Sequence, residues 1–162
     1  MLCTIVVIAS LAFGCGGGEG AKNADKVSVH YTGTLDDGSV FDSSRGKEPL
    51  EFVIGAGEMI AGFDKAVRGM EVGEVKTVKI PPKDAYGEYD EDLVIKINRN
   101  TIPDYFPVKI GDKLPLQSNQ GDSIMAVITD ITEESVICDR NHELAGETLT
   151  FEIELISIGP AN

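Results

Sequence analysis

A long segment with its own pattern of strands and turns interrupts this chain, from about residue 90 to residue 141. Short apolar runs in it are separated by polar turns, which predicts strands over 93–97, 113–117, 124–131 and 135–138. Residues 102–107 indicate a single helical turn. A segment of this length is too long for a plain loop in a compact domain, so we expect a small inserted β-rich domain.

The sequence before this segment predicts further strands. Val27, Val29 and Tyr31 alternate with polar residues, which is the period of a half-buried strand. A turn over 35–39, with glycine at position 38, leads to a second strand from Val40. Two more strands are expected over 50–54 and at 78–80, and Pro81 with the next proline ends the last one.

One helix is expected, beginning near Ile60. Phe63 and Val67 fall on one helical stripe after it, and Gly69 is placed to end the helix. The predicted fold class is therefore α+β, with an antiparallel β-sheet packed on one short helix and a small inserted β-rich domain.

Five short motifs flank the interruption in a fixed order, and together they are far more specific than any one of them. They are Tyr31-Thr32-Gly33, Phe41-Asp42-Ser43-Ser44, the run 59–63, Ala85-Tyr86-Gly87 and the run 149–153. The set resembles the FKBP-type peptidyl-prolyl isomerases. The interruption resembles the insert-in-flap domain of the SlyD subgroup, and 141–146 resembles its return sequence, with Glu143 where relatives usually carry proline.

The resemblance implies four parts: a leader and linker over 1–25, an FKBP-like domain over 26–89, the insert over 90–141, and the last strand and tail over 142–162. It also implies a cleft for the prolyl bond. Phe63 would form the floor, and the backbone N–H of Ile60 would hold a substrate carbonyl. Asp42, held by Tyr31, would lie by the rotating amide. The walls would be Tyr31, Phe41 and Phe151. The remaining members would be Tyr86 as a hydroxyl donor, and Met59 and Leu50 as apolar substrate contacts.

Each of these residues also has a simpler explanation. An aromatic residue in a strand usually belongs to the core, Asp42 before two serines suits a turn, and Tyr86 before a glycine suits a loop anchor. The ordered set favours the cleft. Rotation of a prolyl amide needs no nucleophile, metal or cofactor, and the sequence carries no recognisable set of such groups. His30 lies in a strand pattern and His142 at a junction, so no metal site is expected.

Two classes of function remain open from the sequence. The first is a peptidyl-prolyl cis-trans isomerase that assists folding, with an insert that binds unfolded clients as a chaperone. The alternative is a non-catalytic holdase chaperone. The expected partners are unfolded or proline-containing polypeptides, and we expect a monomer. A formal net charge of −13 excludes nucleic acid as a partner, because phosphate binding needs clustered lysine and arginine.

The N-terminal region predicts a signal. Residues 2–13 carry no charge and end before Cys15, and a glycine-rich tether follows. The pattern resembles a bacterial lipoprotein signal with Cys15 as the lipidation site, which predicts an envelope protein anchored to a membrane and facing the periplasm or exterior. An ordinary cleaved signal and a cytoplasmic extension are the alternatives. Cys138 lies in an apolar strand-like run, so we expect a buried, unreactive thiol.

Overall fold

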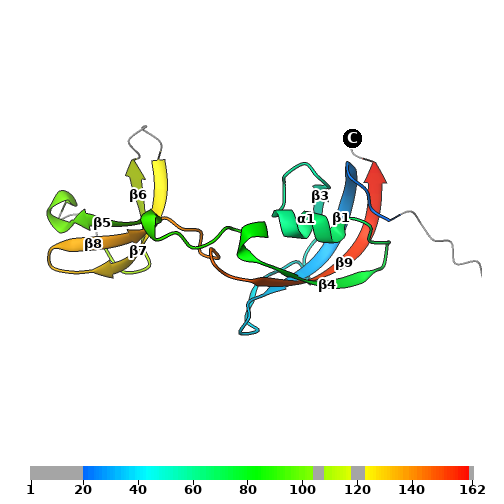
Figure 1. Ribbon diagram of the computed structural model, residues 1–162, viewed down its shortest axis with the longest axis horizontal. Helices are drawn as coiled ribbons and strands as arrows, with labels where there is room; N and C mark the ends of the chain where they lie inside the picture. The colour runs from blue at the N-terminus through cyan, green and yellow to red at the C-terminus, as the bar shows by residue number, and fades with distance from the viewer. Residues whose placement is uncertain (1–19, 104–107, 118–122, 161–162) are drawn as a thin grey trace, which may run out of the picture.

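The computed structural model describes residues 20–103, 108–117 and 123–160, and it contains two antiparallel sheets. Figure 1 shows the sheets at opposite ends of an elongated molecule, joined by two connecting segments. We call them the sheet A lobe (20–89 and 142–160) and the sheet B lobe (90–141). Cys15 and the rest of the expected signal lie outside the described residues. Within the described residues, no helix is long and apolar enough to cross a membrane.

Sheet A is formed from both flanks of the chain. The strand order is β2-β1-β9-β4, and β3 also pairs with β1. Its strands are β1 (Asp25–Thr34), β2 (Val40–Ser43), β3 (Leu50–Val53), β4 (Val75–Ile80) and β9 (Leu149–Pro160).

The two ends of the sheet B lobe meet at one edge of sheet A. Strand β4 precedes the lobe in the chain, β9 follows it, and the two pair with Ile80 opposite Leu149. An inserted domain can be added at such a point without separating the strands on either side, because both connections leave from the same place.

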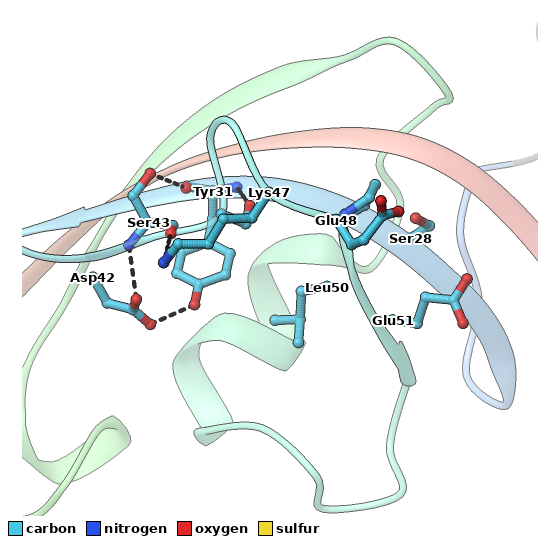
Figure 2. A pocket seen from close by; sticks show the side chains of 10 residues that line it. Ser28, Tyr31, Asp42, Ser43, Lys47, Glu48, Leu50 and Glu51 are labelled. Carbon is cyan, nitrogen blue, oxygen red and sulfur yellow. Dashed lines mark hydrogen bonds between the residues drawn. The ribbon is translucent and has the colours of Figure 1, made fainter.

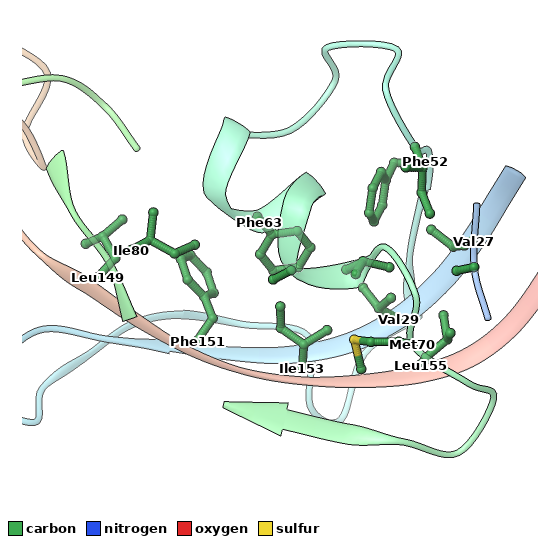
Figure 3. Close-up of a cluster of buried hydrophobic side chains, with 14 residues drawn as sticks. Val27, Val29, Phe52, Phe63, Met70, Ile80, Leu149, Phe151, Ile153 and Leu155 are labelled. Atoms are coloured by element: carbon green, nitrogen blue, oxygen red, sulfur yellow. The ribbon is translucent and has the colours of Figure 1, made fainter. Parts of the chain in front are cut away.

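The helix α1 (Ala61–Val67) lies across one face of sheet A. Phe63 is fully buried between the helix and the sheet, and Figure 3 shows it facing Phe151 of β9. Gly69, with φ of +80°, allows the turn that ends the helix. The Asp64 carboxylate accepts hydrogen bonds from the Gly55 N–H, at 2.6 Å, and from the Arg68 guanidinium, which ties the helix to the turn after β3.

Sheet B has the order β5-β8-β7-β6 and a smaller core. Its strands are β5 (Val94–Asn98), β6 (Lys113–Gln117), β7 (Ser123–Ile131) and β8 (Ser135–Asp139). Among the residues that the structure describes in this lobe, the buried core is aliphatic apart from one thiol, and its members are Ile102, Leu114, Ala126, Ile128, Val136 and Cys138. Burial raises the pKa of the Cys138 thiol, as the apolar run predicts.

The α+β fold class is confirmed, with a separate small sheet as its inserted part. The helical turn expected over 102–107 does not begin at Ile102. A 3₁₀-helix, η3 (Arg99–Thr101), ends before Ile102, and the Asn98 side chain caps it by accepting from the Asn100 N–H at 2.9 Å. Residues 104–107 lie outside the described residues. Two other 3₁₀-helices, η1 (Pro82–Asp84) and η2 (Glu91–Leu93), were not expected.

Candidate active site

A cavity of about 200 Å³ opens between α1 and the aromatic residues of sheet A. It is lined by all the expected cleft residues except Leu50, together with Glu58: Tyr31, Phe41, Asp42, Glu58, Met59, Ile60, Phe63, Tyr86 and Phe151. These residues come from separate parts of the sequence, and β1, β2, α1, the loop after η1 and β9 bring them together.

The rings in the cavity pack edge to face. The centroids of Phe63 and Phe151 lie 5.1 Å apart at 81°, and those of Tyr31 and Phe63 lie 5.7 Å apart at 83°. Phe41 meets Phe151 at 90°. Edge-to-face pairs are the preferred arrangement of aromatic rings, so these contacts hold the floor and walls in defined positions.

Gly33 makes room for two of these walls. A Cβ atom at this position of β1 would lie 2.5 Å from Cζ of Phe41 and 3.0 Å from Cε1 of Phe151. The first contact is shorter than real Cβ atoms make and the second is tighter than most, so the absence of a side chain lets the two rings pack against the strand. The φ angle of Gly33 is not positive, so glycine is needed here because a side chain would not fit, and not because of the backbone conformation.

Tyr31 and Asp42 form a polar pair at the edge of the aromatic floor. The Tyr31 hydroxyl donates to Oδ2 of Asp42 at 2.5 Å, and the Ser43 N–H donates to Oδ1 at 2.8 Å. Burial, followed by the hydrogen bond to Asp42, raises the pKa of Tyr31 to about 12. Tyr31 is therefore a neutral donor at physiological pH, and it holds the carboxylate beside the cavity as expected from the resemblance.

Ile60 lies at the start of α1 and faces the cavity. Its carbonyl accepts from the N–H groups of Phe63 and Asp64. Its own N–H precedes the helix and so stands outside the intrahelical hydrogen bonds. Met59 adds an apolar side, and Glu58, which was not expected in the site, accepts from the Val53 N–H at 3.0 Å.

Tyr86 lies at the rim and is 39% exposed. Its ring stacks on the imidazole of His142, with centroids 3.9 Å apart and planes at 2°. No local pattern predicts this contact, because His142 follows the sheet B lobe in the chain and Tyr86 precedes it.

Leu50 lies outside this cavity, in an adjoining open groove of about 700 Å³. Tyr31 and Asp42 line both spaces. Figure 2 shows the side chains of Leu50 and Glu51 on opposite sides of β3, with Lys47 donating to the Ser43 carbonyl nearby. The expected contact between Leu50 and a substrate remains a prediction, and the structure places it beside the cleft.

The chemical groups of the cavity are few. It offers apolar rings, a carboxylate held by a phenol, a second phenol at its rim, and the Glu58 carboxylate, which accepts from the Val53 N–H. Among the described residues, no group of three histidine, cysteine or acidic side chains is placed to hold a metal ion. Such a site can enclose and polarise a substrate.

Comparison with known proteins gives the family of the chain. The model of the FKBP-type peptidyl-prolyl cis-trans isomerase family matches residues 17–156. The FKBP-type peptidyl-prolyl cis-trans isomerase SlyD of Treponema pallidum is 40% identical over 135 residues, which cover 83% of this chain and 76% of that protein. A short-type peptidyl-prolyl cis-trans isomerase of Methanocaldococcus jannaschii is 40% identical over 154 residues, covering 86% of this chain and 95% of that protein.

A solved structure is similar as well. The crystal structure of FkpA from Escherichia coli matches with a TM-score of 0.50 and 27% identity. The match covers 91% of this chain and 46% of that chain, so this chain spans less than half of the FkpA structure.

Proposed function

This chain belongs to the FKBP-type peptidyl-prolyl cis-trans isomerases, and we propose that its two lobes divide the work of assisting protein folding. The sheet A lobe rotates prolyl bonds in the aromatic cavity. The sheet B lobe captures unfolded or proline-containing polypeptides and brings their prolyl bonds to that cavity.

The single observation that carries the first half is the set of aromatic rings that lines one cavity beside the Tyr31–Asp42 pair. An X-Pro amide rotates slowly because resonance keeps it planar, with a barrier of about 18–20 kcal/mol. Rotation localises the nitrogen lone pair and reduces the amide dipole, so transfer from water to an apolar cavity favours the twisted state. No covalent step is required.

The positions of the residues support specific roles. Phe63 is fully buried beneath the cavity and forms the floor under the proline ring, with Phe41 and Phe151 as walls. Asp42 lies at the rotating amide, and the Ile60 N–H holds a substrate carbonyl. Tyr86 donates its hydroxyl to a second carbonyl of the same peptide.

Exposed apolar side chains support the second half. Ile110 is 65% exposed and Met125 is 53% exposed. Met125 and Val127 line a groove of about 190 Å³ beside sheet B, together with the polar residues Lys113, Asp139, Asn141, His142 and Glu143. An exposed methionine adapts to many partner shapes, which suits clients that share no sequence.

Replacement of residues 90–141 by a short connecting turn tests this division. We expect the variant to retain most activity on a proline tetrapeptide, because the cavity is formed outside those residues. Its rate on a proline-limited refolding protein should fall by about 100-fold, since capture raises the local concentration of prolyl bonds.

The two assays separate the two halves of the proposal. Equal loss on both substrates would show that capture and rotation are not divided between the lobes. A wild-type chain that suppresses aggregation without accelerating tetrapeptide isomerisation would instead be a holdase with an inactive cavity.

We further propose that Cys15 is acylated and anchors the protein to a membrane of the cell envelope, facing the periplasm or exterior. The uncharged run before Cys15 and the glycine-rich stretch after it support this, and the family match begins only at residue 17. Each buried CH₂ adds about 0.8 kcal/mol, so two or three acyl chains would hold the protein firmly.

Mass spectrometry of protein expressed from its native start in a bacterial host tests the anchor. We expect a diacyl or triacyl group on Cys15, and Cys15→Ser should move the protein into the soluble fraction. An intact Met1 with unmodified Cys15 would favour a cytoplasmic protein.

A further inference from the structure

The ring of Tyr86 stacks on a residue that follows the sheet B lobe in the sequence. Tyr86 lies on the segment that leaves sheet A, and His142 lies on the segment that returns. Their rings are nearly parallel, at 2°, with centroids 3.9 Å apart. This is a stack between two segments that the chain separates by an entire sheet.

The turn that carries His142 is itself fixed. The Leu144 N–H donates to Nδ1 of His142 at 3.1 Å, and the Ala145 N–H donates to the His142 carbonyl at 2.8 Å. The Gly146 N–H then donates to the carbonyl of Gly87, the residue after Tyr86, at 2.9 Å. The imidazole is therefore orientated by its own turn, and that turn is bonded to the backbone beside Tyr86.

Tyr86 needs such support. It lies at the rim of the cavity, and an exposed side chain changes rotamer within nanoseconds unless something packs against it. A hydroxyl that donates to a substrate carbonyl is useful only when its ring is already in position.

We propose that His142 is a positioning residue for prolyl isomerisation, whose imidazole holds the Tyr86 ring at the rim of the cavity. This inference rests on the role proposed for Tyr86 above. His142 also lines the groove on sheet B with Met125 and Val127. His142 therefore links the groove, which it lines, to Tyr86 at the rim of the cavity, and a polypeptide lying in the groove would lie next to the residue that orientates Tyr86.

Tetrapeptide isomerisation by the full chain tests the proposal with a set of four variants. His142→Ala should lower kcat/KM about three- to tenfold, the factor expected from the loss of one aromatic stack. His142→Phe should recover to within about twofold, because it keeps a flat ring while losing Nδ1. Tyr86→Ala should also be slow, and the double variant Tyr86→Ala with His142→Ala should be no slower than Tyr86→Ala alone.

Glu147→Ala is the matched control, since Glu147 is exposed on the same returning segment and lines neither the cavity nor the groove. It should match the wild-type rate. A slow Tyr86→Ala with a wild-type rate for His142→Ala would overturn the positioning role and leave that of Tyr86 intact. Losses that multiply in the double variant, or a His142→Phe variant as slow as His142→Ala, would also overturn it. A wild-type rate for Tyr86→Ala would remove Tyr86 from the proposed function and this inference with it.

Discussion

The two lobes differ in where their aromatic residues lie and in the kind of hollow that each forms. The sheet A lobe turns its aromatic rings inward, where Phe63, Phe151 and their neighbours pack edge to face around a small cavity. The buried core of the sheet B lobe contains no aromatic ring among its described residues, and Met125, which is 53% exposed, lines an open groove on its sheet. Rotation of one bond requires a fixed and water-poor site, whereas capture of varied chains requires an accessible and adaptable surface.

A pair of core truncations should separate the lobes most strongly. Phe63 and Ile128 are both buried, at 0% and 1% exposure. We expect Phe63→Ala to lower the free energy of unfolding by about 3–5 kcal/mol and to abolish most tetrapeptide activity, because it removes the floor as well as packing. Ile128→Ala should cost about 2–5 kcal/mol in the sheet B lobe and leave the tetrapeptide rate near wild type.

Urea unfolding and the tetrapeptide assay, measured on both variants below their unfolding transitions, check this pair. If Ile128→Ala slowed the tetrapeptide reaction as much as Phe63→Ala does, the two lobes would be one cooperative unit and the contrast between them would be wrong.

A smaller effect is expected from Gly33→Ala. The added methyl group would lie 2.5 Å from the Phe41 ring, so this ring, which forms a wall of the cavity, must shift. Overpacking of this kind costs about 1–3 kcal/mol of stability, and the displaced wall should lower kcat/KM as well. Gly159→Ala is the control, because its Cβ would lie 3.8 Å from the Lys26 carbonyl oxygen in the same β1–β9 pair. Equal rates for the two variants would show that Phe41 does not shape the site.

Local sequence patterns predicted most strands of both sheets to within one or two residues. Alternation, glycine turns and the prolines at 81 and 82 act over a few residues, so they can be read without knowing the fold. The length of β9 could not be read in this way, since it runs on to Pro160 by pairing with β1 and β4 at the same time. The turn expected over 102–107 does not begin at Ile102, because the 3₁₀-helix capped by Asn98 ends at Thr101; residues 104–107 lie outside the described part of the chain.

The site was less accessible to sequence reasoning than the fold. The expected cleft residues came from the family resemblance, and the structure brings all but Leu50 to one cavity. Glu58 and His142 were missed. Glu58 follows a turn with no pattern of its own, and the stack of His142 on Tyr86 joins two segments that the whole sheet B lobe separates in the sequence.

The polar pair of the sheet A lobe should respond to alkaline pH. The folded state favours neutral Tyr31, so its contribution to stability is complete below about pH 10, the usual tyrosine value, and is lost as the pH rises towards the folded pKa of about 12. Asp42→Leu removes two of the causes of that shift and should lower the pKa of Tyr31 while burial keeps it raised. The same variant should slow tetrapeptide isomerisation by about tenfold, the value of one charge-assisted hydrogen bond.

Tyrosinate absorbance during alkaline titration, together with the tetrapeptide rate at neutral pH, measures both effects. Ile128→Ala serves as the control here too, because a change confined to the sheet B lobe should leave the titration of Tyr31 where it was. An unchanged rate in Asp42→Leu would remove this carboxylate from the chemistry and reduce it to a turn residue.

The smallest effect is expected from a matched pair of exposed side chains. Met125 and Val72 are exposed to similar extents, at 53% and 59%, but Met125 lines the groove of the sheet B lobe and Val72 lies in a turn of the sheet A lobe. Neither substitution by serine should alter the free energy of unfolding by more than about 0.5 kcal/mol, because little packing is lost at exposed positions. Met125→Ser should nevertheless weaken binding of a permanently unfolded polypeptide by about two- to fivefold, since single contacts in an interface are mostly worth less than about 1 kcal/mol. Val72→Ser should bind this polypeptide like the wild type. Titration calorimetry of both variants measures this difference in binding. Equal weakening would mean that any exposed apolar residue contributes to capture. The distinction between the sheet A lobe and the sheet B lobe would then rest on the cavity of the sheet A lobe alone.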